Sequence, residues 1–216
     1  MQAAQSSALT GRPPSLHSRF SELTDVPEIE MRVIEDKRKR LVRAAAELSH
    51  ARGLSRISLS DIAASADVPL GNIYYYFKTK AAIGEAVVAE RLAELQGIQQ
   101  ACDAASTPQG RLKAFVQITV DNRDTLARAG CPIGTLCSEL SKDTGTLSEE
   151  AAVPFRRLLS WMEAQFAALG RNEERRSLAL HLLAALQGVS LLANCFHEPA
   201  LVVREAKVLK AWIEAL

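Results

Sequence analysis

The sequence has few of the residues that build metal sites, disulfide frameworks and catalytic motifs. Its 216 residues include four cysteines without a CxxC pair and four histidines without an HExxH spacing. These gaps argue against a structural zinc module and a disulfide scaffold, and they favour reduced thiols and no bound metal. The GxSxG motif, phosphate-binding loops and dinucleotide fingerprints are also missing. We therefore expect no catalytic residues and no cofactor.

The sequence also lacks long stretches of alternating apolar and polar residues. Apolar residues instead recur at helical spacing nearly throughout, which predicts an all-α protein of about nine helices. Residues 1–30 contain no basic start followed by an apolar run, so we expect a flexible N-terminal tail rather than a secretory signal, and a cytoplasmic location.

One stretch, residues 178–196, is apolar enough to resemble a membrane span. It carries His181, Gln187, Ser190 and Asn194, of which the last three share one stripe of a helix. A spanning helix of this length rarely carries four polar groups. We therefore interpret the stretch as a buried helix of a soluble protein that has no membrane partner.

A net charge of only +1 conceals an uneven distribution. Residues 31–84 contain ten basic and five acidic side chains, an excess of +5, which leaves −4 on the rest of the chain. This asymmetry favours a small basic unit that binds nucleic acid, attached to a larger acidic unit that regulates and dimerises. The expected domains are a tail over 1–30, a DNA-binding domain over 31–84 and a helical regulatory and dimerisation domain over 85–216.

Three short helices are expected in the basic unit. An amphipathic helix covers residues 37–52, and Ser58 with Asp61 forms a capping box that opens a second helix. Asp67 stands where the chain must turn before a third helix over 70–77. Two short helices joined by a tight turn predict a helix-turn-helix whose second helix enters the major groove of DNA.

The third helix carries side chains suited to reading DNA. Gly71 permits close approach, Asn72 can present a donor and an acceptor to a base edge, and Lys78 can neutralise phosphate charge. The three successive tyrosines at 74–76 could form an aromatic core strip, but they lie about 100° apart around a helix, so at least one ring must face away from the core. The basic run at 37–40 fits either a solvated helix start or phosphate contact.

The stretch LVRAAAELSHARGLSRISLSDIAASADVPLGNIYYYFKTKAAI, residues 41–83, resembles the DNA-binding head of the TetR family of transcriptional regulators. The similarity rests on the order of paired alanines, Gly53, the capped helix at Ser58, Gly71, the aromatic run and Lys80. The sequence departs from the common pattern at four positions, which affects turn and packing detail: Ser49, Asp67, Pro69 and Ala82 stand where Phe, Gly, Ser and Glu are usual.

The resemblance implies a homodimer that binds a near-palindromic double-stranded DNA operator and contacts itself through its last two helices. It implies a repressor released by a small-molecule inducer. The implied phosphate contacts are Ser58 or Ser60, Tyr75, Tyr76 and Lys80, and the implied base contacts are Leu70, Gly71, Asn72 and Tyr74. The alternative is an all-helical enzyme or small-molecule-binding protein with a fortuitous helix-turn-helix.

The expected regulatory domain, residues 85–216, offers two candidate sensing features. The resemblance implies an inducer pocket among the middle helices, and core packing is the alternative reading of every residue that could line it. These candidates are Phe115, Trp161, Phe166, Gln187, Ser190 and Asn194.

The second feature is a cysteine. Cys131 precedes Pro132, which suits a first helical position, so its thiol is expected at a helix N-terminus where the thiolate is favoured. The segment GCPIGTLCSELSK resembles a subgroup of the family, some of whose members sense reactive species. The alternative is a buried, small apolar cysteine. A disulfide to Cys137 is not expected, because six residues separate the two by about 240° around one helix.

Overall fold

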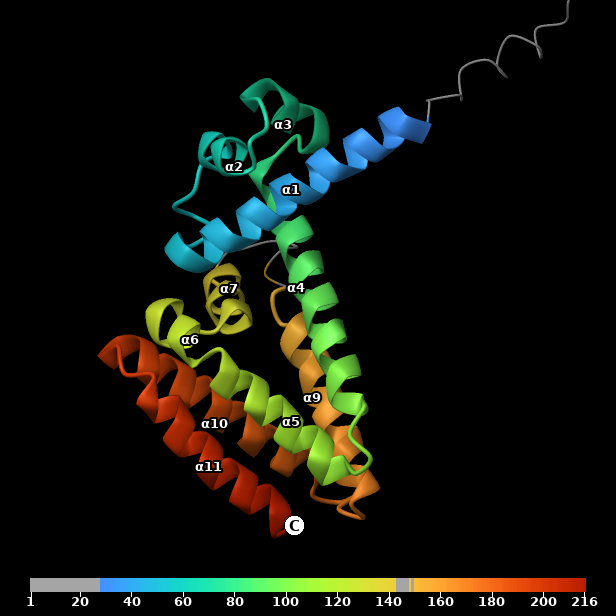
Figure 1. The fold of residues 1–216 in the computed structure, drawn as a ribbon, viewed down its shortest axis with the longest axis vertical. Coiled ribbons are helices and arrows are strands. Elements are labelled where there is room, and N and C mark those ends of the chain that lie inside the picture. The colour runs from blue at the N-terminus through green and yellow to red at the C-terminus, as the bar shows by residue number, and fades with distance from the viewer. Residues whose placement is uncertain (1–27, 143–147, 149) are drawn as a thin grey trace, which may run out of the picture. The chain divides into compact units, whose positions relative to one another are not determined.

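The computed structural model describes residues 28–142, 148 and 150–216, and this part of the chain is all-α, as predicted (Figure 1). It contains ten helices and no strand over those residues. Their bounds are α1 (Glu28–Arg52), α2 (Leu59–Ser65), α3 (Leu70–Tyr76), α4 (Lys80–Asp103), α5 (Pro108–Asp121), α6 (Arg123–Ala129), α7 (Pro132–Leu140), α9 (Val153–Ala168), α10 (Arg175–Phe196) and α11 (Ala200–Glu214).

The chain divides into two units, Met1–Lys37 and Arg38–Leu216. Within the first unit, the described residues are the start of α1, which begins at Glu28, nine residues before the predicted start at Lys37. Residues 28–36 are mostly good helix formers, a weaker signal than the apolar periodicity that marked Lys37. The rest of the predicted tail lies outside the described residues.

Within the second unit, the local signals of the helix-turn-helix behave as predicted. Ser58 and Asp61 form the predicted capping box of α2. The structure also shows that Thr79 caps α4 by accepting a hydrogen bond from the Ala82 amide. Asp67 has φ +51°, so it makes the turn between α2 and α3 in the left-handed region. Asp tolerates that region better than most residues, which explains why glycine is dispensable here.

The stretch from Pro108 to Gly130 divides into α5 and α6 at Asn122, which raises the number of described helices from the expected nine to ten. The Asn122 side-chain amide donates to the Ile118 carbonyl at 2.8 Å, and its backbone carbonyl accepts from the Leu126 amide at 2.9 Å. Asn122 therefore ends one helix and begins the next, without the Gly or Pro that would mark the break in the sequence.

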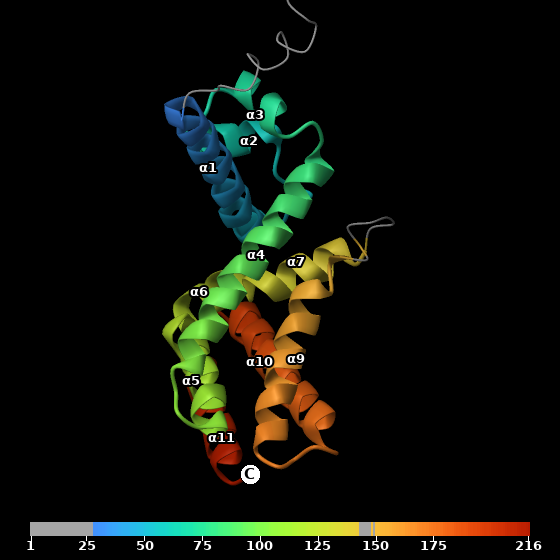
Figure 2. The same ribbon diagram turned by 90° about the vertical axis from the view of Figure 1, so that its right-hand side faces the viewer.

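Two main hydrophobic cores position the candidate sites. One joins α1–α4 and includes Leu136 and Leu140 of α7. The other joins α4, α5, α9, α10 and α11 around Met162 and Phe166. Helix α4 contributes to both cores, and Figures 1 and 2 show it leaving the helix-turn-helix and running alongside α5 and α9. We call the helix-turn-helix part the head and the remaining helices of the second unit the body.

Helix α10 is long and apolar enough to cross a membrane by length and composition alone. In the structure it packs against α6, α9 and α11, and Ala179, Leu182 and Ala193 are fully buried in the body. Its polar stripe is also satisfied internally, because Ser190 donates to the Leu186 carbonyl at 2.8 Å and Asn194 donates to the Ala127 carbonyl at 3.2 Å. These contacts fit the predicted core helix.

Candidate functional site

The aromatic run on α3 is divided between the core and the surface. Ile73 and Phe77 are buried in the core of the head, whereas Tyr74 and Tyr75 are 52% and 67% exposed. Tyr76 is half-buried, packs against that core and meets Tyr75 edge to face with ring centroids 5.1 Å apart. This confirms the prediction that at least one tyrosine faces away from the core.

The outer face of α3 continues from the tyrosines to the start of the helix. Leu70 is 45% exposed, and a Cβ built on Gly71 would have no atom within 4 Å. Asn72 is half-buried and Lys78 is exposed. The face can therefore approach another surface closely, with an exposed apolar side chain and two phenol rings beside it.

The other predicted DNA contacts have partners inside the head. Ser58 donates its hydroxyl hydrogen bond to Asp61 at 2.5 Å, and its oxygen lies 2.7 Å from that of Ser60. The hydroxyl and the backbone amide of Ser58 both donate to the Asp61 carboxylate, and these two hydrogen bonds hold its pKa below the usual value. The Lys80 ammonium donates to the Ser55 carbonyl at 2.8 Å, on the loop before α2. Both serines and Lys80 are exposed, so they remain available to an outside partner.

Cys131 occupies the N-cap of α7, where the sequence placed it. Its half-buried Sγ accepts hydrogen bonds from the Gly134 amide at 3.4 Å and from the Gln187 side-chain amide at 3.6 Å. Gln187 reaches it across Gly134, where any Cβ would overlap the Gln187 amide oxygen. A side chain at position 134 would therefore push the Gln187 amide away from its present place beside Cys131, a packing role that the sequence alone did not reveal.

The four cysteines are free thiols in different surroundings. Cys102 and Cys137 are buried, and burial is the main cause that raises the pKa of both, that of Cys137 to about 11. Cys195 is exposed on the last turn of α10. Only Cys131 among the four combines partial access with two N–H donors on its sulfur in the described structure.

Two cavities meet at Cys131. A cavity of about 530 Å³ lies among α4, α5, α6 and α10 and is lined by Phe115, Leu95 and Leu183, with polar groups at one side. A cavity of about 700 Å³ lies between the end of α1, α7 and α10 and includes Asn194. Four residues line both cavities: Cys131, Phe155, Gln187 and Ser190.

The structure brings only some of the predicted ligand residues together. Phe115 lines the smaller cavity, Asn194 the larger, and Gln187 and Ser190 both. Trp161 and Phe166 line neither of these two cavities. Trp161 meets Phe115 at a tilt of 46° with ring centroids 5.7 Å apart, and its indole N–H donates to Asp103 at 3.1 Å. Phe166 is fully buried beside Trp212.

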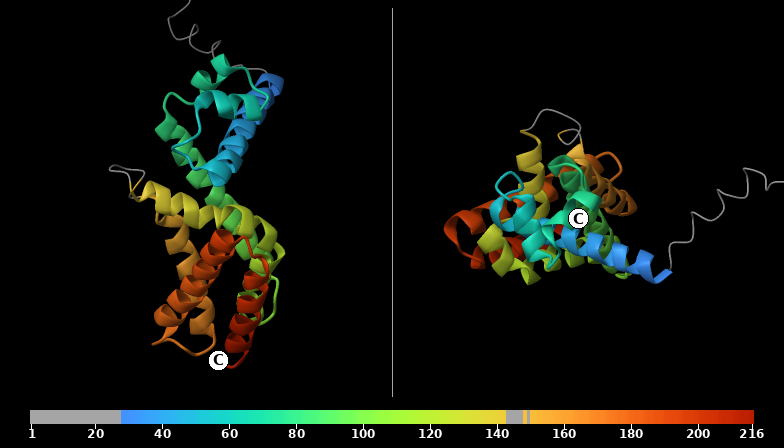
Figure 3. Two further views of the ribbon diagram at one scale, coloured as in Figure 1. Left: turned by 90° about the vertical axis from the view of Figure 1, so that its left-hand side faces the viewer. Right: turned by 90° about the horizontal axis from the view of Figure 1, so that it is seen from above.

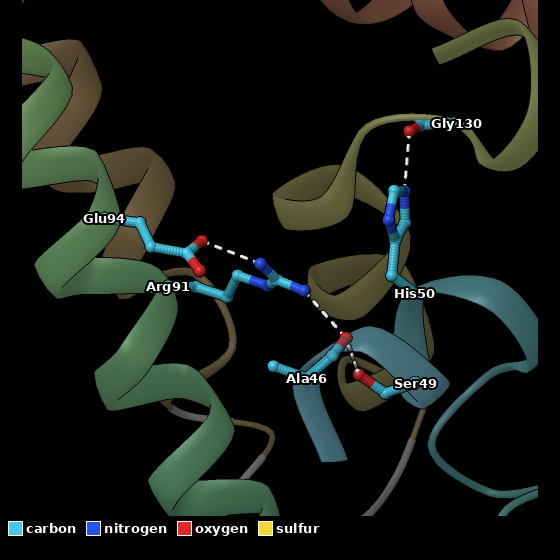
Figure 4. A network of polar contacts seen from close by, with 6 residues as sticks. All are labelled: Ala46, Ser49, His50, Arg91, Glu94 and Gly130. Atoms are coloured by element: carbon cyan, nitrogen blue, oxygen red, sulfur yellow. Dashed lines mark hydrogen bonds and ion pairs between the residues drawn. The ribbon is translucent and has the colours of Figure 1, made fainter. Parts of the chain in front are cut away.

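The polar end of the smaller cavity, formed by His50, Arg91 and Glu94, was not expected from the sequence. Figure 4 shows the contacts of these side chains. Arg91 of α4 is buried, pairs with Glu94 at 2.7 Å and donates to the Ala46 carbonyl of α1 at 2.7 Å. His50 of α1 lies 2.9 Å from the Gly130 carbonyl. One signal in the sequence could have revealed this site: Arg91 lies on the apolar stripe of α4 formed by Val87, Val88 and Leu95. A charged side chain on a buried stripe is rare unless it is paired, so it indicates a polar site inside the protein.

Burial lowers the pKa of His50, and the charges of Arg91 and Arg128 lower it further, against the raising effect of the hydrogen bond to Gly130. The neutral imidazole donates from Nε2 to that carbonyl. Because Arg91 and Glu94 cancel in charge, the polar end of the cavity carries no net charge from these three residues.

The C-terminal helices carry an exposed apolar surface. Helices α10 and α11 pack side by side, as Figure 3 shows in orange-red and red. Their large exposed apolar residues are Leu180, Leu191, Leu192, Phe196, Val203 and Val208, and a groove of about 460 Å³ between them is lined by Leu192, Leu201 and Val208. Clustered apolar exposure of this kind marks an interaction surface.

Among the residues that the structure describes, no group of three or more metal-ligating side chains occurs.

Known proteins resemble this chain in sequence and fold. Residues 41–87 match the family model of the bacterial regulatory proteins of the tetR family. The transcriptional repressor DhaR of Mycobacterium sp. (strain GP1) is 31% identical over 153 residues, which cover 68% of this chain and 74% of DhaR. The transcriptional repressor NemR of Escherichia coli (strain K12) is 29% identical over 119 residues, 53% of this chain and 57% of NemR.

Solved structures share the fold. The reduced form of E. coli NemR superposes with a TM-score of 0.69 at 22% identity, covering 81% of this chain and 96% of the NemR chain. A TetR regulator from Chloroflexus aurantiacus reaches a TM-score of 0.74 at 21% identity, with 85% and 96% covered.

Proposed function

Because this chain belongs to the TetR family of transcriptional regulators and is a DNA-binding regulator, we propose that it is a cytoplasmic, homodimeric repressor released from its operator by a small molecule or by modification of Cys131. The observation that carries the DNA-binding part is the outer face of α3, where Tyr74 and Tyr75 are exposed beside Leu70 and Gly71. A recognition helix needs such a face, since side chains buried in the core cannot reach a base edge.

The proposed contacts divide by chemistry. Base edges and thymine methyl groups suit Leu70, Gly71, Asn72 and Tyr74 at the start and middle of α3. Phosphates suit the hydroxyls and ammonium groups around it, which belong to Ser58, Ser60, Tyr75, Tyr76, Lys78 and Lys80. We propose residues 31–84 as the DNA-binding domain and 85–216 as the regulatory and dimerisation domain, with residues 1–30 as a tail. Helix α4 crosses the proposed boundary at residue 84.

The exposed apolar faces of α10 and α11 support dimerisation. Leu191 and Phe196 on α10 are 62% and 64% exposed, and Val208 on α11 is 61% exposed. A second copy would bury these residues and place two α3 helices on one face of DNA, about 34–36 Å apart for successive half-sites. A near-palindromic operator follows from this two-fold symmetry.

The smaller cavity supports a small-molecule inducer. Its volume of about 530 Å³ lies within the range of sites for drug-sized ligands. It is mainly apolar, with Phe115 on one side and Gln187, Ser190 and Cys131 on another. A molecule inside it can contact the thiol, so ligand binding and thiol modification act at one place.

A gel-shift titration with the DNA upstream of the protein's own coding region tests the DNA-binding proposal. We expect saturable binding that weakens steeply as salt rises, because phosphate contacts release counterions. Lys80→Ala should lower the affinity and reduce the salt slope by about one. An all-helical enzyme or small-molecule-binding protein with a fortuitous helix-turn-helix would show no saturable binding even at low salt.

The release proposal has its own test. Operator affinity is measured before and after thiol alkylation in the wild type and in Cys131→Ser. We expect alkylation to weaken binding only where Cys131 is present. An unchanged affinity in the alkylated wild type, or full release of Cys131→Ser by the same reagent, contradicts a sensing role for this thiol.

A further inference from the structure

Helix α7 belongs to the cavity wall at one end and to the head at the other. Its N-cap residue, Cys131, lines both cavities. Its buried residues Leu136 and Leu140 are part of the hydrophobic core of the head, together with Leu41 and Ile62. If this nine-residue helix shifts at the cavity, its buried residues move within the core of the head, and the packing of that core must change.

Glu139 adds a specific polar link from α7 to the head. Its two carboxylate oxygens accept hydrogen bonds from the backbone amides of Leu54 at 2.8 Å and Ser55 at 2.6 Å, in the loop between α1 and α2. Bonds to an ionised carboxylate are stronger than neutral ones. Burial opposes ionisation, but the bonds from Ser55 and Leu54 and the charge of Lys80 outweigh it and lower the pKa of Glu139.

The loop is shaped to receive this carboxylate. Gly53 has φ +87°, a conformation that side chains rarely adopt, and a Cβ there would lie 3.4 Å from a carboxylate oxygen of Glu139. The positive φ therefore requires glycine at the end of α1, and the turn that it makes presents the amides of the next two residues to Glu139, whereas an added Cβ would be in ordinary contact with the carboxylate. We call the loop over residues 53–57 the clamp loop.

The same loop is bonded to a predicted DNA contact. The Ser55 amide donates to Glu139, while the Ser55 carbonyl accepts from the Lys80 ammonium at 2.8 Å. Three residues further on, Ser58 caps α2. A single residue of the clamp loop thus joins α7 to the first residue of α4 and lies next to the start of the helix-turn-helix.

We propose that Glu139 is the positioning residue that transmits the state of the Cys131 end of α7 to the DNA-binding head, by holding the clamp loop against Lys80. Cys131 and Glu139 lie about 12 Å apart along one helix, at 1.5 Å per residue, so the helix acts as a short rigid lever. This inference rests on the proposed release of the operator through the cavity or the thiol, and it names the contact that carries the signal.

The test uses iodoacetamide in a Cys195→Ser background, where Cys102 and Cys137 are buried and Cys131 is the accessible thiol. The thiolate sulfur displaces iodide, so an S–C bond forms as the C–I bond breaks. Two quantities are measured before and after alkylation: hydrogen exchange of the Leu54 and Ser55 amides, and operator affinity. The variants are Glu139→Ala, the conservative Glu139→Gln, and Glu173→Ala as a control that removes an exposed carboxylate.

In the background protein and in Glu173→Ala, we expect alkylation to speed exchange of the two amides and to weaken operator binding by a factor of about 5–150, the usual range of allosteric coupling. In Glu139→Ala the amides should exchange rapidly before alkylation, and alkylation should change the affinity less than about threefold. Glu139→Gln, which retains an acceptor, should lie between the two. The ratio of operator affinity before alkylation to that after it is measured within each variant. A substitution that only lowers stability therefore does not produce the expected change in this ratio.

The outcomes separate this inference from the proposed function. If alkylation leaves the exchange of Leu54 and Ser55 unchanged in the background protein, the inference is overturned, even if the operator is released. It is also overturned if Glu139→Ala responds to alkylation as the background protein does. If the amides respond through Glu139 while operator affinity stays constant, the link through Glu139 stands and the proposed release by Cys131 fails.

Discussion

The aromatic residues proposed to contact DNA in the head and those predicted to bind ligand in the body lie in different surroundings. In the head, Tyr74 and Tyr75 are exposed on a short helix whose other face, Ile73 and Phe77, is buried. In the body, Phe166 is fully buried and Phe115 forms part of a cavity wall. A surface that reads another molecule must leave its side chains outside the core, whereas a ligand cavity needs rigid packing around it. The contrast predicts that substitutions in the two regions affect different measurements.

The largest expected effect is in the body. Phe166→Ala removes a fully buried ring beside Trp212 and should lower the free energy of unfolding by about 3–5 kcal/mol. Urea denaturation measures this change. Because Phe166 lines neither of the two cavities that meet at Cys131, any loss of ligand response should follow the loss of stability. A variant of unchanged stability that no longer responds to ligand would instead place Phe166 in the binding site.

In the head, Tyr75→Phe should change the free energy of unfolding by no more than about 0.5 kcal/mol relative to the wild type, because the hydroxyl that is removed lies on an exposed ring. It should weaken operator binding about tenfold, the effect of losing a hydrogen bond to a charged phosphate. A gel-shift titration measures the affinity. Trp161→Phe in the body serves as the control, which should retain the operator affinity of the wild type. Equal affinities for Tyr75→Phe and the wild type would remove Tyr75 from the proposed contacts.

At the boundary between the cavities, Gly134→Ala should cost about 1 kcal/mol of stability, because the added methyl group displaces the Gln187 side chain from Cys131. The same substitution in a Gln187→Ala background should cost almost nothing, since the obstructing amide is gone. Urea denaturation of the two single variants and the double variant gives the coupling. Additive costs would show that Gly134 is required for another reason.

The smallest effect concerns pH. The pKa of His50 is lowered from 6.5 in the folded protein, so between the two pKa values the unfolded chain binds more protons. Its contribution to stability is complete above pH 6.5 and is lost as the pH falls below that value. The stability of the wild type relative to His50→Gln should therefore decrease between pH 7.5 and 5.5 in urea titrations. A constant difference would mean that His50 is not shielded as the structure indicates.

Local signals in the sequence were sufficient for much of the head and for the start of α7 in the body. The capping box of Ser58, the turn at Asp67 and the N-cap position of Cys131 follow from interactions within a few residues, and the structure confirms all three. The division at Asn122 was not expected, because a single Asn gives a weak signal beside the Gly and Pro that usually end helices.

The candidate ligand residues were harder to predict. Gln187, Ser190 and Asn194 share a stripe that does face the cavities, and Phe115 joins them. Helical spacing cannot distinguish such a residue from Phe166 or Trp161, because a core and a cavity wall are both apolar. His50 and Arg91 reach the cavity from helices far apart in the sequence, so only their packing reveals them.

By itself, the sequence determined that this protein is all-α, that its positive charge gathers in residues 31–84, and that a helix-turn-helix with outward tyrosines lies there. Those properties depend on local spacing and on the identity of neighbouring residues. The tertiary structure alone decided that Glu139 of α7 accepts hydrogen bonds from the loop before α2, that Gln187 reaches Cys131 across Gly134, and that Arg91 of α4 donates to the Ala46 carbonyl of α1. Each of these contacts joins residues 45–85 or so positions apart, where only the packing of helices brings the atoms within hydrogen-bond distance.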